Sequence, residues 1–218
     1  MLTTITIIAA LVIPVNAEKP IKQQLLVDQA RITFESFMID QNMAWFRDHM
    51  HEAKGFLIIP ELLQGAFFVG GSGGRGVLVV KDQATGDWSQ PVFYTLGSGS
   101  LGIQFGVEKS EIIMAVFTQK GLDRLYSTSF KFGGDVSIAA GPVGAGAKAD
   151  VMTDFVSFVR SKGAFAGISL EGAIVKVNND WNQEYYGKKV SPLGIVEQKL
   201  VSNPGSAELL KTVQGSFE

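Results

Sequence analysis

The chain of 218 residues contains no cysteine. It therefore cannot form disulfides, thiolate metal sites or a cysteine nucleophile, and this sequence offers no cysteine for a covalent lipid anchor. If the protein attaches to a membrane, we expect that attachment to be noncovalent.

An excess of charge of either sign is also missing. The 19 basic and 21 acidic side chains leave a formal net charge of −2. Domains that bind nucleic acid usually carry a strongly basic surface, so we expect no nucleic-acid partner. Binding to any anion would have to come from a local group of cations.

Catalytic groups are scarce as well. The two histidines, His49 and His51, are two residues apart on a predicted helix, where they point about 200° from each other and cannot share a metal ion. The stretch Gly70–Gly74 matches G-x-S-x-G, but both histidines precede it, against the hydrolase order. The stretch Gly71–Gly76 matches G-x-G-x-x-G, but an apolar strand pattern follows it where a dinucleotide site needs a helix. We expect no enzyme, no metal and no cofactor.

The first 17 residues carry no charged side chain, and the apolar stretch from Ile5 to Val15 is interrupted only by Pro14. This stretch is too short to span a bilayer. Small side chains at Val15-Asn16-Ala17 fit a signal-peptidase site, so we expect residues 1–17 to be a signal peptide and the protein to be periplasmic or extracellular. The alternative is a buried N-terminal strand or helix.

Residues 18–54 contain no glycine and have helical periodicity. One face of a first helix is apolar, with Leu26, Ala30, Phe34, Phe37 and Met38. A second helical stretch is predicted to start near Asn42, which is a suitable cap, and to place Met43, Phe46 and Met50 on one face.

From Gly55 onward the pattern changes, because 18 of the 25 glycines lie between Gly55 and Ala147 among short apolar runs. Glycines inside apolar strands allow bulges and close backbone contact, which is typical of a sheet that curves on itself. The sequence predicts one α+β domain over residues 18–218, with the helical segment 18–54 and a strongly curved antiparallel β-barrel or sandwich over 55–218. Short peripheral helices are expected near Thr118, Asn182 and Pro204.

The strand pattern also predicts one glycine-rich turn and one long strand later in the chain. Residues Gly65–Val69 are expected to pair with Gly76–Lys81 across a glycine-rich turn. That turn comprises Gly70, Gly71, Ser72, Gly73, Gly74 and Gly76. One further long strand is expected over Phe165–Val177.

Five short runs occur in a characteristic order. They are Gly70-Gly71-Ser72-Gly73-Gly74-Arg75-Gly76, Trp88-Ser89-Gln90-Pro91, Ala140-Gly141-Pro142, the segment from Arg160 to Gly172, and Tyr185-Tyr186-Gly187. In this order they resemble the SYLF domain, from about Lys22 to Phe217. The resemblance implies noncatalytic binding of phosphorylated lipids, with phosphatidylinositol-type lipids in eukaryotic members. Actin is a partner only by family analogy, and the exported character resembles stand-alone bacterial members.

A lipid site needs cations that can meet a phosphate beside apolar groups that can enter the interface. The candidate headgroup-binding cations flank the first helix, the predicted sheet edge, the glycine-rich turn and a basic turn between strands: Lys19, Lys22, Arg31, Lys54, Arg75, Arg160 and Lys162. We expect them to support peripheral contact with acidic or phosphorylated membrane lipids, without a transmembrane helix. A basic turn such as Arg160–Lys162 can also be simply solvated.

Two alternatives stay open. The protein could instead be an envelope scaffold that oligomerises without a specific lipid, through Phe67 and Phe68 or through the first helix. The aromatic cluster of Trp181, Tyr185 and Tyr186 could lie at a membrane interface or pack over the end of the sheet.

Overall fold

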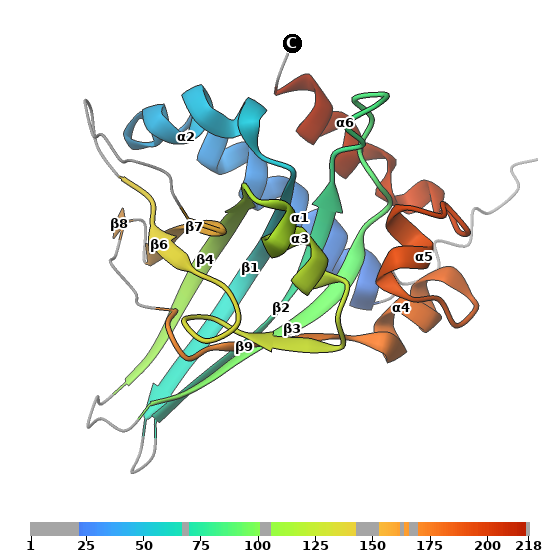
Figure 1. The fold of residues 1–218 in the computed structure, drawn as a ribbon. Helices are drawn as coiled ribbons and strands as arrows, with labels where there is room; N and C mark the ends of the chain where they lie inside the picture. The colour runs from blue at the N-terminus through green and yellow to red at the C-terminus, as the bar shows by residue number, and fades with distance from the viewer. Residues whose placement is uncertain are drawn as a thin grey trace, which may run out of the picture.

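The computed structural model describes residues 22–66, 70–100, 106–142, 153–161, 164–165 and 170–216. These residues form one strongly curved sheet with helices on both of its faces (Figure 1). The expectation of an α+β fold with a curved, largely antiparallel sheet is therefore confirmed. The predicted signal peptide lies outside the described residues.

The helices begin with the predicted N-terminal segment and continue around the sheet. Their bounds are α1 Lys22–Ile39, α2 Ala44–His49, α3 Gln119–Leu125, α4 Asn179–Tyr186, α5 Pro192–Val196 and α6 Ala207–Gly215, with short 3₁₀ turns at Gln41–Met43, Met50–Glu52 and Pro204–Ser206. The strands are β1 Gly55–Ala66, β2 Gly70–Val80, β3 Val92–Ser100, β4 Gly106–Val116, β5 Ser129–Lys131, β6 Ile138–Ala140, β7 Phe155–Ser161, β8 Ala164–Phe165 and β9 Ile174–Val177.

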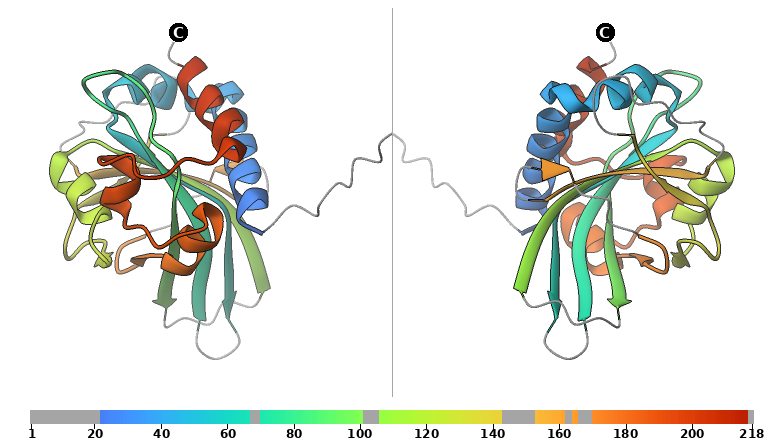
Figure 2. Two further views of the ribbon diagram at one scale, coloured as in Figure 1. Left: turned by 90° about the vertical axis from the view of Figure 1, so that its right-hand side faces the viewer. Right: turned by 90° about the vertical axis from the view of Figure 1, so that its left-hand side faces the viewer.

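The strands follow the order β5-β9-β3-β2-β1-β4-β7-β6, and β8 pairs with β7. The pairings are antiparallel except that of β6 with β7, which is parallel. Figure 2 shows the glycine-rich ends of β1 to β4 extending beyond the helical layer. The start of α1 lies close to the glycines of β2 on the helical side of these ends, where Lys22, Gly73 and Gly74 line one groove.

The two faces of the sheet bury two separate apolar cores. One core receives Leu122 and Leu125 from α3 and Val196 from α5. The other receives Phe34 and Phe37 from α1, together with side chains from α2, α4 and α6. The apolar face predicted for the first helix is therefore correct, because it packs on the sheet.

The predicted glycine-rich turn is wrong. Residues 70–76 belong to strand β2, where Gly71 pairs with Gly65 and Gly74 with Leu62. The register shifts between Ile58 and Glu61, around Pro60, and this bulge presses the β1 backbone against β2. The glycines serve close strand contact, which sequence reasoning mistook for a reversal of the chain.

Two smaller predictions also need correction. The expected strand Phe165–Val177 is divided into β8 and β9, because Gly172 adopts a φ of 80° and its N–H bonds to the carbonyl of Phe132. The predicted cap Asn42 instead donates its backbone N–H to the Asp40 carboxylate at 2.9 Å. The predicted helices near Thr118, Asn182 and Pro204 are confirmed, and Thr118 caps α3 as expected.

Close packing at the bulge predicts a large effect of one methyl group. A Cβ atom added at Gly76 would lie 2.5 Å from the Ile58 carbonyl oxygen. Gly76→Ala should therefore lower the free energy of unfolding in urea by about 1–3 kcal/mol, the usual range for overpacking. Gly73→Ala is the matched control on the same strand, because its nearest contact would be 3.9 Å away. Equal stability of the two variants would contradict this account of the glycines.

Candidate functional site

A groove of about 420 Å³ lies between the start of α1 and the glycine-rich part of the sheet. Strands β1 to β3 form its floor, and α4 closes one end. Its lining residues are Lys22, Leu26, Gln29, Glu61, Leu63, Gly73, Gly74, Arg75, Thr95 and Trp181. The structure thus brings together two of the predicted cations, Lys22 and Arg75, with two of the predicted glycines.

The floor of the groove is open at Gly73 because this residue has no side chain, whereas a Cβ atom at Gly74 would point to the opposite face of the sheet, toward Ile59. Gly74 could not carry one, since a Cβ atom there would lie 2.6 Å from the Glu61 carbonyl oxygen. Gly73 has room for a Cβ atom. A side chain at position 73 would therefore fit and would fill the groove. Position 74 must be glycine, because the bulged backbone of β1 occupies the space of a Cβ atom.

The walls of the groove are held by contacts between distant segments. Gln23, next to Lys22, hydrogen-bonds to Glu184 of α4, and the Gln24 side chain donates to the Gly205 carbonyl at 2.8 Å. Trp181 is a partly buried residue in the first turn of α4, and its backbone N–H donates to the side chain of the Asn178 cap at 3.2 Å. Its ring packs edge-on against Phe93, with ring centres 5.9 Å apart.

The cations of the groove are available to a ligand. The Arg75 guanidinium lies over the Trp181 ring, 4.8 Å from its centre, which orients the side chain without neutralising its charge. Glu61 forms an ion pair with Lys109 at 2.8 Å. Among the described residues, neither Lys22 nor Arg75 takes part in an ion pair. The groove therefore combines two available cations with the apolar walls of Leu26 and Leu63.

The other predicted cations lie elsewhere. Arg31 pairs with Glu35 one turn further along α1, at 3.0 Å. Lys54 precedes β1 at the end of that strand remote from the groove. Lys19 and Lys162 are outside the described residues.

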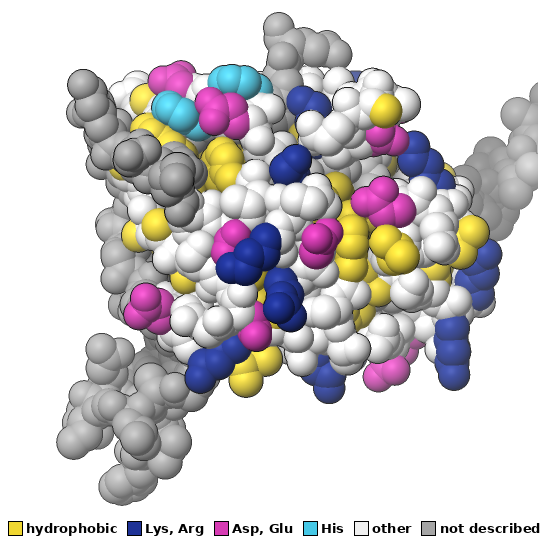
Figure 3. Space-filling view, in the orientation of Figure 1, with side chains coloured by type: hydrophobic (Ala, Val, Ile, Leu, Met, Phe, Trp, Pro, Cys, Tyr) yellow, Lys and Arg dark blue, Asp and Glu magenta, His cyan; other side chains and the backbone are white. Residues whose placement is uncertain are grey.

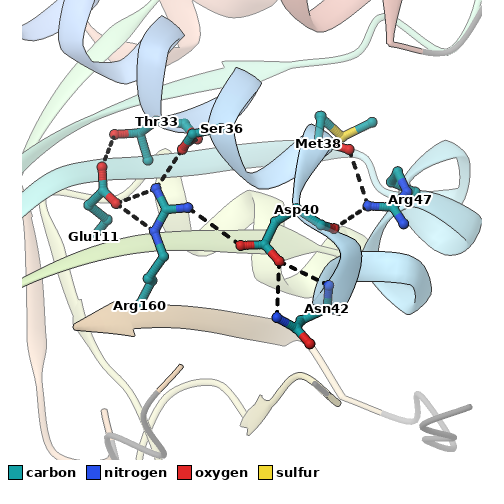
Figure 4. Close-up of polar contacts among 8 residues, drawn as sticks. All are labelled: Thr33, Ser36, Met38, Asp40, Asn42, Arg47, Glu111 and Arg160. Carbon is teal, nitrogen blue, oxygen red and sulfur yellow. Dashed lines mark hydrogen bonds and ion pairs between the residues drawn. The ribbon is translucent and has the colours of Figure 1, made fainter. Parts of the chain in front are cut away.

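Arg160 forms hydrogen bonds and ion pairs that connect the sheet with α1 and the turn after it (Figure 4). Its guanidinium donates to the Glu111 carboxylate, with the Nε contact at 2.8 Å, and to the Ser36 hydroxyl at 2.6 Å. It also lies 3.8 Å from the Asp40 carboxylate and 4.7 Å from the centre of the Phe37 ring. Only 16% of its side chain is exposed. These contacts leave Arg160 poorly placed to meet a headgroup.

Sequence reasoning missed Thr95 and Gln29 as groove residues and grouped Trp181 with the two tyrosines. In the structure Tyr185 is buried and packs edge-on against Phe93, as the packing interpretation predicts. Trp181 instead reaches the groove. The sequence could not separate Trp181 from Tyr185, because they lie one turn apart on α4 and so share a face of the helix. The contact of Trp181 with Arg75 joins residues that are distant in sequence.

The expectations about metal ligands, histidines and membrane helices can be compared with the part of the chain that the structure describes. No group of three side chains suited to metal coordination occurs there. The His49 ring stacks on Trp45 with ring centres 4.2 Å apart, and its Nδ1 contacts the Trp45 carbonyl. Among the described helices, none is both long and apolar enough to cross a bilayer.

These features define an α+β domain with a curved sheet and a cationic groove. A family model described as "Ysc84: Las17-binding protein actin regulator" matches residues 97–216, which is more than half of the chain. The chain belongs to this family, which confirms the resemblance to the SYLF domain. The family description names binding and regulation and no catalytic activity.

Several curated proteins are similar to this chain. Protein YSC84 of Saccharomyces cerevisiae is 31% identical over 173 residues, which cover 76% of this chain and 36% of the yeast protein. LAS seventeen-binding protein 3 of the same yeast is 28% identical, covering 77% and 38%. SH3 domain-containing YSC84-like protein 1 of Bos taurus is 26% identical, covering 76% and 49%. The chain therefore spans between about a third and a half of the length of these relatives.

The network around Arg160 predicts a loss of stability when this side chain is replaced. Arg160→Met removes charge-assisted hydrogen bonds to a partly exposed carboxylate, and should lower the free energy of unfolding by about 1–3 kcal/mol. Arg124→Met, at an exposed position on α3, should change it by less than about 0.5 kcal/mol. Urea unfolding measures both. An Arg160→Met variant as stable as the wild type would show that the network does not hold α1 to the sheet.

Proposed function

We propose that this domain binds acidic or phosphorylated lipid headgroups, without catalysis, in the groove between α1 and β2. The observation that carries the proposal is the convergence of Lys22 and Arg75 over a floor of glycines. A guanidinium and an ammonium group can both donate to phosphate oxygens, the guanidinium in a bidentate manner. The missing side chain at Gly73 gives a bulky headgroup access to the strand backbone.

The apolar surroundings support contact with a membrane surface. Leu63 beside the groove is 41% exposed, and Leu25 on α1 is 45% exposed. An exposed apolar side chain such as Leu63 can enter the interfacial layer while the cations that line the same groove meet the headgroups. Because the net charge of the chain is −2, attraction to anionic lipid has to come from this local patch and should weaken with salt.

Actin is a second partner to consider, because the matching family is described as an actin regulator. The similar yeast protein is named for binding to LAS seventeen. The chain covers only part of such relatives, so an actin-related role is carried over by analogy alone. We place lipid binding first, because two cations that could meet an anion, Lys22 and Arg75, line one groove.

We propose export as part of the same account, supported by the uncharged apolar N-terminal segment in the sequence. Cleavage after Ala17 would give a mature protein beginning at Glu18, which would meet lipids in the periplasm or outside the cell. The intact mass of the protein recovered from its native cell measures this directly. Retention of residues 1–17 in the mature protein would contradict it.

The alternative role as a scaffold is favoured by one observation. Leu25, Ile32 and Ile39 recur every seven residues along α1 and are 45%, 54% and 77% exposed. Such a ridge can mediate self-association. A stable oligomer in sedimentation velocity without lipid, combined with no binding to vesicles, would support the scaffold and contradict the lipid proposal.

The lipid proposal predicts the effect of each groove cation on co-sedimentation with vesicles. Lys22→Gln and Arg75→Gln should each weaken binding to vesicles of phosphatidylcholine with phosphatidylinositol phosphate by about fivefold, since each cation near an anionic surface contributes about 1 kcal/mol. The double variant should be weakened by roughly 25-fold. Lys211→Gln, at an exposed position on α6, is the matched control and should bind like the wild type.

Two further comparisons sharpen this test. Gly73→Leu fills the floor without removing a charge, so it should also weaken binding if the groove holds the headgroup. Vesicles of phosphatidylcholine alone, and a second series at higher salt, should both reduce binding by the wild type. Equal binding to neutral and anionic vesicles, or unchanged binding by the double variant, would contradict the proposal.

A further inference from the structure

A second pocket, of about 350 Å³, lies on the opposite face of the sheet from the groove. It opens between the turn at residues 82–87, helix α3 and helix α5. Val80, Leu122 and Val196 of its floor belong to the core under α3 and α5. Trp88 of its floor belongs, like Leu26 of the groove, to the core under α1. Figure 3 shows the face that carries α3 and α5, where acidic and basic side chains lie close to exposed apolar ones. The proposed lipid site does not include this pocket.

The floor of the second pocket is apolar. Val80, Leu122 and Val196 contribute aliphatic surface from β2, α3 and α5. Trp88 adds an aromatic ring, which stacks on Phe56 with ring centres 5.2 Å apart and is therefore held in place. A pocket of this size with an apolar floor and a few polar groups at its rim is the usual form of a small-ligand site.

The rim carries acidic and basic side chains, and two of them, Asp82 and Lys199, form an ion pair with each other. Lys199 contacts the Asp82 carboxylate at 2.8 Å, and the backbone N–H groups of Ala84 and Thr85 donate to the same carboxylate. The hydrogen bond from Lys199 is the main reason why the pKa of Asp82 falls to about 2. Asp82 and Lys199 therefore neutralise each other over the working pH range.

Two carboxylates, those of Asp87 and Glu197, lie on the rim beside this ion pair. The pKa of Lys199 is raised first by its hydrogen bond with Asp82, and the charges of Asp87 and Glu197 add to this effect. One oxygen of Glu197 accepts the Tyr126 hydroxyl at 2.7 Å, which orients the carboxylate. With Lys81 also on the rim, the lining holds three carboxylates and two ammonium groups. The excess is negative.

We infer that the second pocket binds an organic cation, in which an ammonium or guanidinium group meets Asp87 and Glu197 while an apolar stem lies on Trp88, Leu122 and Val196. The same chemistry could come from a free amine or from a lysine or arginine side chain of a peptide. Leu193 and Leu200 are exposed and lie close in sequence to the lining residues Val196 and Lys199, so they could add contact area for a peptide but not for a small amine.

A titration of the full chain by ¹⁵N-resolved NMR tests the inference, with hexylammonium as the probe and hexanoate as its anionic counterpart. Hexylammonium should produce saturable shifts at the Trp88 indole and around Leu122 and Val196, and should bind more weakly at higher salt. Glu197→Gln and Asp87→Asn should each weaken binding by about fivefold. Glu208→Gln, an exposed carboxylate on α6, is the control and should leave the affinity unchanged.

A second arm distinguishes the two sources of the cation. If the natural ligand is a peptide, acetyl-Lys-Leu-Leu-amide should bind at least about tenfold more tightly than hexylammonium, and Leu200→Ser should remove that gain only. Equal affinities would assign the pocket to a free amine. Equal shifts with hexanoate, no saturable shift with hexylammonium, or unchanged affinity in both carboxylate variants would overturn the inference.

Discussion

Close contact between the glycines of β2 and the bulged backbone of β1 is the constraint on which the rest of the structure depends. At Gly76 and Gly74 the β1 carbonyl oxygens occupy the space that a Cβ atom would need, at 2.5 and 2.6 Å. This contact follows the register shift between Ile58 and Glu61, and such bulges increase the twist and bend of a strand. The same stretch of glycines leaves a groove where α1 begins.

The two arginines of the sheet differ in their surroundings, because α1 covers only part of the curved sheet. Arg160 lies on the part of the sheet that α1 covers, where Glu111, Ser36 and Asp40 surround its guanidinium. Arg75 lies near the start of α1, and its guanidinium lies over the face of the Trp181 ring. Two arginines on different strands of one sheet, β7 and β2, therefore have different surroundings, because α1 covers Arg160 whereas Arg75 lies beside the start of α1.

Much of the fold could be predicted from local patterns. The apolar spacing of α1, the Thr118 cap and the abundance of glycine identified the first helix, α3 and the curved sheet. The role of residues 70–76 could not be predicted, because a run of glycines permits a turn and a closely packed strand equally well. Only the pairing with β1 decides between them, and that pairing depends on residues distant in sequence.

The candidate site was predicted in part for the same reason. Lys22 and Arg75 were both among the predicted cations, but their proximity results from the return of the chain through β1 and β2. Helix α5 was missed although Ser191 caps it and Pro192 occupies its first turn, because the helix has only five residues. The second pocket combines segments that are more than 100 residues apart in the chain, such as those of Lys81 and Lys199. No local sequence pattern could predict it.

The central claim is that the groove over Gly73 and Gly74 is where this domain meets a phosphorylated headgroup. An NMR titration with a soluble short-chain phosphatidylinositol phosphate, below its micelle concentration, tests it most directly. The account predicts that the largest shifts occur at the amides of Lys22, Gly73, Gly74 and Arg75 and at the Trp181 indole. Saturable shifts centred elsewhere, with these five signals unmoved, would contradict it.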